Sequence, residues 1–146
     1  MAQYVFLFIL FGVLATRIGL GQLFIDLAMV IAGRYSGGPA KVAIFSSAFL
    51  GTISGSSIAN TVTTGSLTIP AMKKVGYPPH FSGAVEATAS TGGQITPPIL
   101  GAAAFIMVEY LELPLRDILA AALIPALLHY FGIFVMVHLE LSLIHI

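Results

Sequence analysis

Gly51-Thr-Ile-Ser-Gly-Ser-Ser-Ile-Ala-Asn-Thr61 and Ser90-Thr-Gly-Gly-Gln-Ile-Thr-Pro-Pro98 are the two stretches that decide the fold of this chain. Both combine helix-breaking residues with oxygen-bearing side chains, and both lie within otherwise apolar sequence. Lipid cannot satisfy backbone groups that leave a helix at hydrocarbon depth, so such groups must line a cavity inside protein. Two interruptions of this kind predict a path or a binding site within a membrane.

The composition around these stretches excludes a soluble globular domain. The 146 residues are 58% hydrophobic and 8% charged, whereas soluble domains carry about 25% charged residues. The net charge of zero gives no indication of a nucleic-acid partner. The absence of Cys excludes disulfides and thiolate metal sites.

The two ends of the sequence predict a fragment of a longer protein. Met1-Ala-Gln-Tyr4 has no basic residue, and no small-residue cleavage site follows the apolar run, so a signal peptide is not expected. The chain stops abruptly after Glu140. We expect residues 1–140 to belong to one membrane domain and residues 141–146 to be a non-native tail.

The apolar segments predict an all-α, polytopic integral membrane protein. The expected units are a first membrane helix with an interfacial arm helix (1–38), a re-entrant hairpin (39–74), a broken helix (80–110) and a membrane helix (116–140). The arm helix over 22–33 is too short to span, and it fits equally a position in the interface plane and a position buried against neighbours. Lys41, Lys73 and Lys74 mark the open ends of the hairpin, which places its base on the cytoplasmic side.

The prolines of the second stretch predict a cation site. A proline cannot donate to the carbonyl four residues back, so Pro97 frees the Gly93 carbonyl and Pro98 frees the Gln94 carbonyl. The side-chain oxygens of Thr91, Gln94 and Thr96 lie nearby in sequence. Unwound carbonyls at half-helix ends bind Na⁺ in secondary transporters. The alternative is a simple proline kink whose freed groups are satisfied by hydroxyls or water.

The first stretch predicts an anion site. Nine Ser or Thr hydroxyls lie between Thr52 and Thr68, together with Asn60. A helix that begins near the midplane points its N-terminal amides into the break, where a carboxylate substrate could bind. The additional donors would be Ser56, Ser57, Asn60 and Thr61. The alternative is close helix packing through small residues, and this is the role we expect for Thr63, Thr64, Ser66 and Thr68.

The remaining titratable residues give weaker signals. Glu86 lies well inside an apolar segment, where an acid is either functional or a hydrogen-bonded group near the interface. His129 and His138 lack ligand spacing and are expected to be structural. No hydrolytic, redox or nucleotide-binding motif is present. The sequence therefore predicts no enzyme, no catalytic residue and no coupling to ATP by this chain.

The motifs together resemble the large membrane subunit of tripartite ATP-independent periplasmic (TRAP) transporters, from Tyr4 to about Glu140. The similar segments are Phe24-Ile-Asp-Leu-Ala28, Ile53-Ser-Gly-Ser-Ser57, Ile69-Pro-Ala-Met72 with Gly76-Tyr77, and Glu86-Ala-Thr-Ala-Ser-Thr-Gly-Gly-Gln-Ile-Thr-Pro-Pro-Ile99. The last segment is most similar to the fused form of the permease, in which small and large membrane subunits share one polypeptide. That form usually works with TAXI-type binding proteins.

The resemblance implies Na⁺-coupled uptake of an organic acid across the bacterial inner membrane. A TAXI-type periplasmic protein would deliver the substrate, and a small membrane subunit or its fused equivalent would complete the permease. The resemblance also implies an elevator-type domain of two inverted repeats, each with one hairpin and one broken helix, of which this chain matches the first. Na⁺ would lie between the hairpin tip and the broken helix, without any other cofactor.

The resemblance assigns these roles to individual residues. The implied Na⁺ ligands are Ser54, Gly55, Ser57, Gly93, Gln94, Thr96 and Pro97. We expect Gln94 to contact the substrate together with the donors of the anion site named above, Ser56, Ser57, Asn60 and Thr61. Two other functions remain open. A passive channel could use the same breaks as a selectivity element, and a structural membrane subunit could have tightly packed helices and no solute site.

Overall fold

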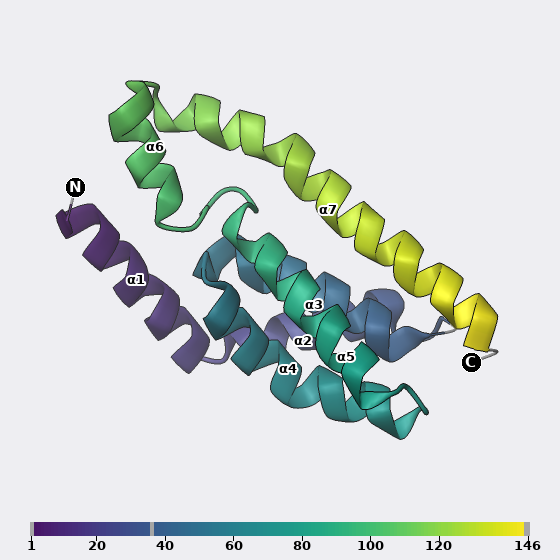
Figure 1. Cartoon of the computed structure of the whole chain (residues 1–146). Coiled ribbons are helices and arrows are strands. Elements are labelled where there is room, and N and C mark those ends of the chain that lie inside the picture. The colour runs from purple at the N-terminus through teal and green to yellow at the C-terminus, as the bar shows by residue number, and fades with distance from the viewer. Residues whose placement is uncertain (1, 36, 145–146) are drawn as a thin grey trace.

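The computed structural model describes residues 2–35 and 37–144, and in this part the chain is built of helices joined by short connections. The helices are α1 (Ala2–Arg17), α2 (Leu20–Ala32), α3 (Gly38–Ser54), α4 (Ser57–Lys74), α5 (Pro79–Thr91), the 3₁₀ turn η1 (Gly92–Gln94), α6 (Ala103–Leu111) and α7 (Leu115–Ile144). The predicted all-α class is confirmed. Figure 1 shows α1 and α7 on opposite sides of the central helices.

The first predicted break is the connection between α3 and α4, which pack against each other. Gly55 adopts a left-handed conformation with φ 56°, and its N–H donates to the Gly51 carbonyl at the end of α3. This conformation is costly for residues with a Cβ. Ser56 is extended, and its hydroxyl accepts a hydrogen bond from the Ala59 N–H at 3.3 Å. Ser56 therefore caps α4, and the helix break lies where the sequence predicts it.

The second predicted break separates α5 from α6. The helix tightens into η1 after Thr91, and the chain is then non-helical until Ala103. Figure 1 shows this extended link between α5, which lies among the central helices, and α6, which lies beside the start of α7. The interruption at Gly92-Gly93 and Pro97-Pro98 is confirmed.

Helix α3 is the centre of the packing, since α1, α2, α4, α5, η1 and α7 all contact it. Its small residues Ala40 and Ala43 are fully buried, which allows neighbouring backbones to approach closely. The main buried apolar cluster consists of Ala40, Ala43, Ile44, Met72, Tyr77, Val85, Ala89, Ile133 and Val137. On the other side of α3, Ala28 and Ala32 of α2 pack against Val42.

Helix α7 carries the residues most suited to contact lipid. Residues Leu115–Glu140 form an apolar stretch of 26 residues, of which the most apolar window is 17% buried. Within the described residues, this is the helix that is long and apolar enough to cross a membrane by length and composition alone. Its exposed side chains include Leu123, Ile124, Leu127, Leu128 and Phe131.

Helices α3 and η1 approach each other through two glycines. A Cβ placed on Gly51 would lie 2.5 Å from the Gly93 Cα atom, and a Cβ on Gly93 would lie 3.0 Å from the Gly51 Cα atom. Both neighbouring atoms belong to the backbone, so neither can move aside as a side chain would. The contact between the two breaks therefore requires glycine on each side.

We predict that Gly51→Ala destabilises the protein by about 1–3 kcal/mol, because the added methyl group would overlap the η1 backbone. The measurement is thermal unfolding of the protein in detergent. The matched control is Gly83→Ala, since a Cβ at Gly83 on α5 meets no atom within 4 Å. Equal unfolding temperatures for the two variants would contradict the glycine contact.

Candidate functional site

The two breaks meet and form one site. The Gln94 side-chain amide donates a hydrogen bond to the Ser57 hydroxyl at 2.9 Å, which joins η1 to the start of α4. Gly55 lies against the extended link, where a Cβ would be 3.0 Å from the Leu100 carbonyl oxygen and 3.1 Å from that of Ile99. Segments that are far apart in sequence thus contribute backbone and polar side chains to the same place.

A cavity of about 480 Å³ opens at this meeting point. It is lined by Gly12, Val13, Ser54, Gly55, Ser56, Ala59, Gln94, Gly101, Ala102 and Ala103. Four of the predicted site residues are therefore among its walls, namely Ser54, Gly55, Ser56 and Gln94. The other walls come from α1, from Ala59 of α4, from the end of the extended link and from the first residue of α6.

The ends of four helical segments surround the cavity. The carbonyl ends of α3 and η1 are at Ser54 and Gln94, and the amide ends of α4 and α6 begin at Ser57 and Ala103. A helix carries partial negative charge at its C-terminal end and partial positive charge at its N-terminal end. The end of α3 can therefore offer carbonyl oxygens to a cation, and the starts of α4 and α6 can offer N–H groups to an anion.

The carbonyl groups near the prolines are hydrogen bonded to a greater extent than the sequence predicts. The Gln94 carbonyl accepts a hydrogen bond from the Gly101 N–H at 2.8 Å, so the prediction that Pro98 leaves it free was wrong. The physical reason is that the chain turns back after the prolines, and Gly101 supplies the missing donor. The neighbouring Gly92 carbonyl accepts from the Ile95 N–H at 3.1 Å and the Thr96 hydroxyl at 2.7 Å.

Other predicted site residues lie near the cavity without lining it. The Asn60 side chain is fully buried and donates to the Ser47 carbonyl at 2.8 Å. The Thr61 hydroxyl donates to the Ser57 carbonyl within α4. Gly93 is buried against Gly51, whereas Pro97 is half-buried in the extended link. The ligand contacts of these residues remain predictions.

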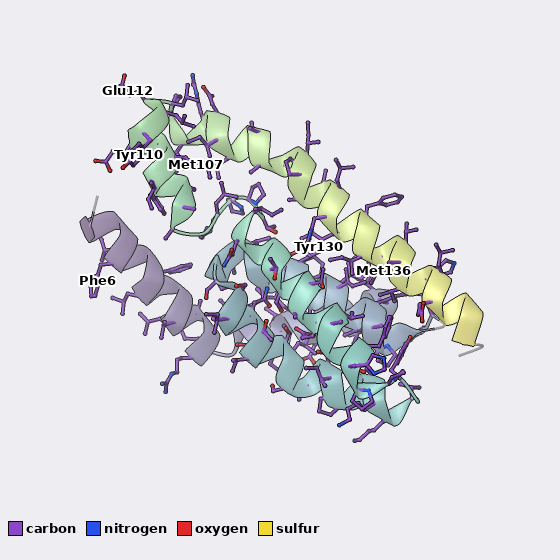
Figure 2. The ribbon with its side chains drawn as sticks, in the orientation of Figure 1. Phe6, Met107, Tyr110, Glu112, Tyr130 and Met136 are labelled. Carbon is purple, nitrogen blue, oxygen red and sulfur yellow. The ribbon has the colours of Figure 1, made fainter. Side chains whose placement is uncertain are left out.

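Helix α7 holds the second break from the opposite side. The Tyr130 side chain points from α7 toward the central helices (Figure 2), and its hydroxyl lies 3.4 Å from the Thr96 hydroxyl. A ring nitrogen of His129 lies 3.0 Å from the Thr88 carbonyl oxygen of α5. These contacts fix α5 and the extended link relative to α7.

A polar cluster away from the cavity surrounds Glu86. The carboxyl group is fully buried, and hydroxyls from three helices hydrogen bond to it. Ser47 and Ser90 donate to Oε1 at 3.2 and 3.1 Å, and Thr64 also donates to Oε1. Thr68 donates to Oε2. Thr64 and Thr68 therefore do more than fill space between helices.

Sequence spacing contains a signal for this cluster. Thr64 and Thr68 are four residues apart on α4, and Glu86 and Ser90 are four residues apart on α5. Residues with this spacing lie on one face of a helix. Two polar pairs on adjacent helices would have predicted the cluster, whereas the contribution of Ser47 from α3 depends on the tertiary packing.

Comparisons with known proteins identify the family. The family model described as "Tripartite ATP-independent periplasmic transporter, DctM component" matches residues 1–144. The isethionate TRAP transporter permease protein DctMQ of Oleidesulfovibrio alaskensis is 41% identical over 91 residues, which cover 62% of this chain and 14% of that protein. The C4-dicarboxylate TRAP transporter large permease protein DctM of Pseudomonas aeruginosa is 32% identical over 124 residues, which cover 83% of this chain and 28% of that protein.

The chain thus spans less than a third of the length of the curated relatives it matches. No solved structure matches it significantly. The relatives just described are transporter permeases, and the family match covers nearly all of the sequence. The chain belongs to the DctM family, the large permease component of tripartite ATP-independent periplasmic transporters.

Proposed function

We propose that this chain is the first inverted repeat of a Na⁺-coupled permease that imports an organic acid across the bacterial inner membrane. The observation that carries the proposal is the cavity at which the hairpin tip and the broken helix meet through the Gln94–Ser57 hydrogen bond. A permease needs no catalytic residue, and the chain acts as a transporter rather than an enzyme.

Helices α3 and α5 are both shorter than the hydrocarbon core that a spanning helix must cross. Helix α3 has 17 residues, or about 26 Å, and α5 has 13 residues, or about 20 Å, against a hydrocarbon core of about 30 Å. Residues 39–74 then form a re-entrant hairpin and residues 80–110 a broken helix. The helix over 116–140 crosses completely. Residues 1–38 supply the first membrane helix and the arm, and residues 141–146 a tail.

We place Na⁺ where the carbonyl ends of α3 and η1 converge. The proposed ligands are Ser54, Gly55, Ser57, Gly93, Gln94, Thr96 and Pro97. The described residues contain no cluster of three His, Cys, Asp or Glu side chains that could hold a metal ion. Neutral backbone and hydroxyl oxygens suit a monovalent cation, and discontinuous helices in transporters bind Na⁺ in this way.

We place the substrate carboxylate at the amide ends of α4 and α6. The proposed contacts are Ser56, Ser57, Asn60, Thr61 and Gln94. One relative is named for C4-dicarboxylates, which have the carboxylate group proposed here. The proposed partners are a TAXI-type periplasmic binding protein and a small membrane subunit, either separate or fused as the name DctMQ indicates for one relative. Movement of the hairpin and broken helix together as an elevator would carry the site across the membrane.

We predict that Gln94→Ala weakens Na⁺-dependent uptake about 2- to 10-fold, because it removes one hydrogen bond worth about 0.5–1.5 kcal/mol between the two halves of the site. The measurement is the Na⁺ dependence of uptake by the complete permease in proteoliposomes with its binding protein. Thr91→Ala is the matched control, since the Thr91 hydroxyl is exposed and donates to the Ala87 carbonyl of its own helix. Unchanged Na⁺ dependence in Gln94→Ala would contradict the site.

We predict that Ser56→Leu abolishes uptake, because the larger apolar side chain fills the cavity and removes the α4 cap. The same assay measures the loss, and membrane insertion checked by protease protection should be retained. Ser66→Leu on the exposed face of α4 is the control, as the Ser66 hydroxyl donates only within its helix. Full activity of Ser56→Leu would favour a structural subunit without a solute site.

We predict that proteoliposomes accumulate the substrate above its external concentration only with an inward Na⁺ gradient and the binding protein. A coupled carrier requires both, whereas a passive channel equilibrates the solute without either. Dissipating the gradient with a Na⁺ ionophore should therefore abolish accumulation. Equilibration at the same rate in the absence of Na⁺ and binding protein would instead support the channel.

A further inference from the structure

We propose that Glu86 is a proton-binding site inside the permease, and that the hydroxyls of α3, α4 and α5 around it accommodate both its charged and its neutral form. This inference goes beyond the proposed Na⁺ and substrate site, because Glu86 does not line the cavity. The proton comes from bulk water and binds one carboxylate oxygen, so the group passes from a charge of −1 to neutral without any other reactant.

The first argument is that Glu86 is buried without a positively charged partner among the described residues. Glu86 is fully buried, and in the described part of the chain no Lys, Arg or His side chain forms an ion pair with it. Within residues 2–35 and 37–144, four hydroxyl groups, and not a counter-ion, are the partners of its carboxyl oxygens. Ionisable groups within membrane segments are functional candidates.

In the described part of the chain, no other titratable group on the elements packed against α5 is hydrogen bonded to Glu86 or paired with it. The Lys41 ammonium of α3 lies 5.5 Å from the Phe134 ring centroid, and Lys73 and Lys74 of α4 are exposed. On α7 these groups are Arg116, Asp117, His129, Tyr130, His138 and Glu140, and on α5 itself His80. Arg116 pairs with Asp117, His129 contacts Thr88, Tyr130 contacts Thr96, and His138 stacks on Phe134.

The spacing of the oxygens is the second argument. Ser47 and Ser90 lie 3.2 and 3.1 Å from Oε1, and Ser47 lies 3.2 Å from Thr64 and 3.4 Å from Ser90. These are hydrogen-bond separations between directly contacting groups. The oxygens therefore form one continuous hydrogen-bonded cluster around the carboxyl group.

The alternative acceptors of the hydroxyls are the third argument. The Thr64 hydroxyl lies 2.9 Å from the Asn60 carbonyl oxygen, and the Thr68 hydroxyl lies 3.0 Å from the Thr64 carbonyl oxygen. A hydroxyl proton can rotate toward either neighbour. With charged Glu86, both threonines donate to the carboxylate. With neutral Glu86, its O–H donates to Thr68, and the threonines donate to their own helix. Both protonation states keep their hydrogen bonds without backbone movement.

The test is infrared spectroscopy of the complete permease in lipid vesicles over a range of pH. We expect a protonated-carboxyl C=O stretching band that Glu86→Gln removes and that loses intensity as the pH rises. Glu112→Gln is the control, since Glu112 is exposed at the α6–α7 connection and its loss should leave the band unchanged. Figure 2 shows Glu112 at the end of α6, away from the central helices.

A second variant keeps the test valid if Glu86→Gln does not fold. Thr68→Val removes one hydrogen-bond partner of Oε2 and should shift the frequency of the same band. A carboxyl band that neither variant alters, or one whose intensity is independent of pH, would overturn the proposal. The spectra require no transport, so they can contradict the proton site while the uptake assays support the Na⁺ and substrate site. The uptake assays can likewise contradict the Na⁺ and substrate site while the spectra support the proton site.

Discussion

The contact between Gly51 and Gly93 is the constraint on which the site depends. Because the backbones of α3 and η1 touch there, the two helix ends a few residues further along are also held side by side. The hairpin tip follows Gly51 within one turn, and the extended link follows Gly93 directly. A larger residue at either position would separate the segments that enclose the cavity. The small residues of this region therefore determine where the polar groups meet.

Hydroxyl groups in this chain fall into two classes with different consequences. Thr63, Thr88 and Thr91 donate to the carbonyl four residues back, which satisfies each group within its own helix. Such residues can pack in an apolar environment without creating a site. Ser56 and Ser57 are different, since Ser56 caps α4 and Ser57 accepts from Gln94. A binding region is therefore distinguished from a packing region by the break in the helix more than by the number of hydroxyl groups.

The sequence was sufficient to predict the helix breaks because their causes are local. Gly55 needs a left-handed conformation and Pro97-Pro98 cannot continue a helix, and both are visible without tertiary information. The hydrogen-bond partners of the carbonyl groups next to the prolines could not be predicted from the local sequence. Gly101 donates to the Gln94 carbonyl only because the chain folds back toward η1. The same limit applies to Asn60, which the structure commits to Ser47 on another helix. The involvement of Gly12 and Val13 in the cavity wall likewise follows from the position of α1, which the pattern of apolar residues leaves undetermined.

Asn60 connects the proposed proton site to the proposed transport site. Its side-chain amide donates to Ser47, its oxygen lies 3.4 Å from the Thr64 hydroxyl, and its nitrogen lies 3.0 Å from where a Gly93 Cβ would be. The Thr64 hydroxyl can donate its proton either to Glu86 or to an oxygen atom of Asn60. The protonation state of Glu86 therefore changes whether Asn60 accepts a hydrogen bond from Thr64. Asn60 also packs directly against the η1 backbone, so one amide side chain contacts both the polar cluster around Glu86 and the second break.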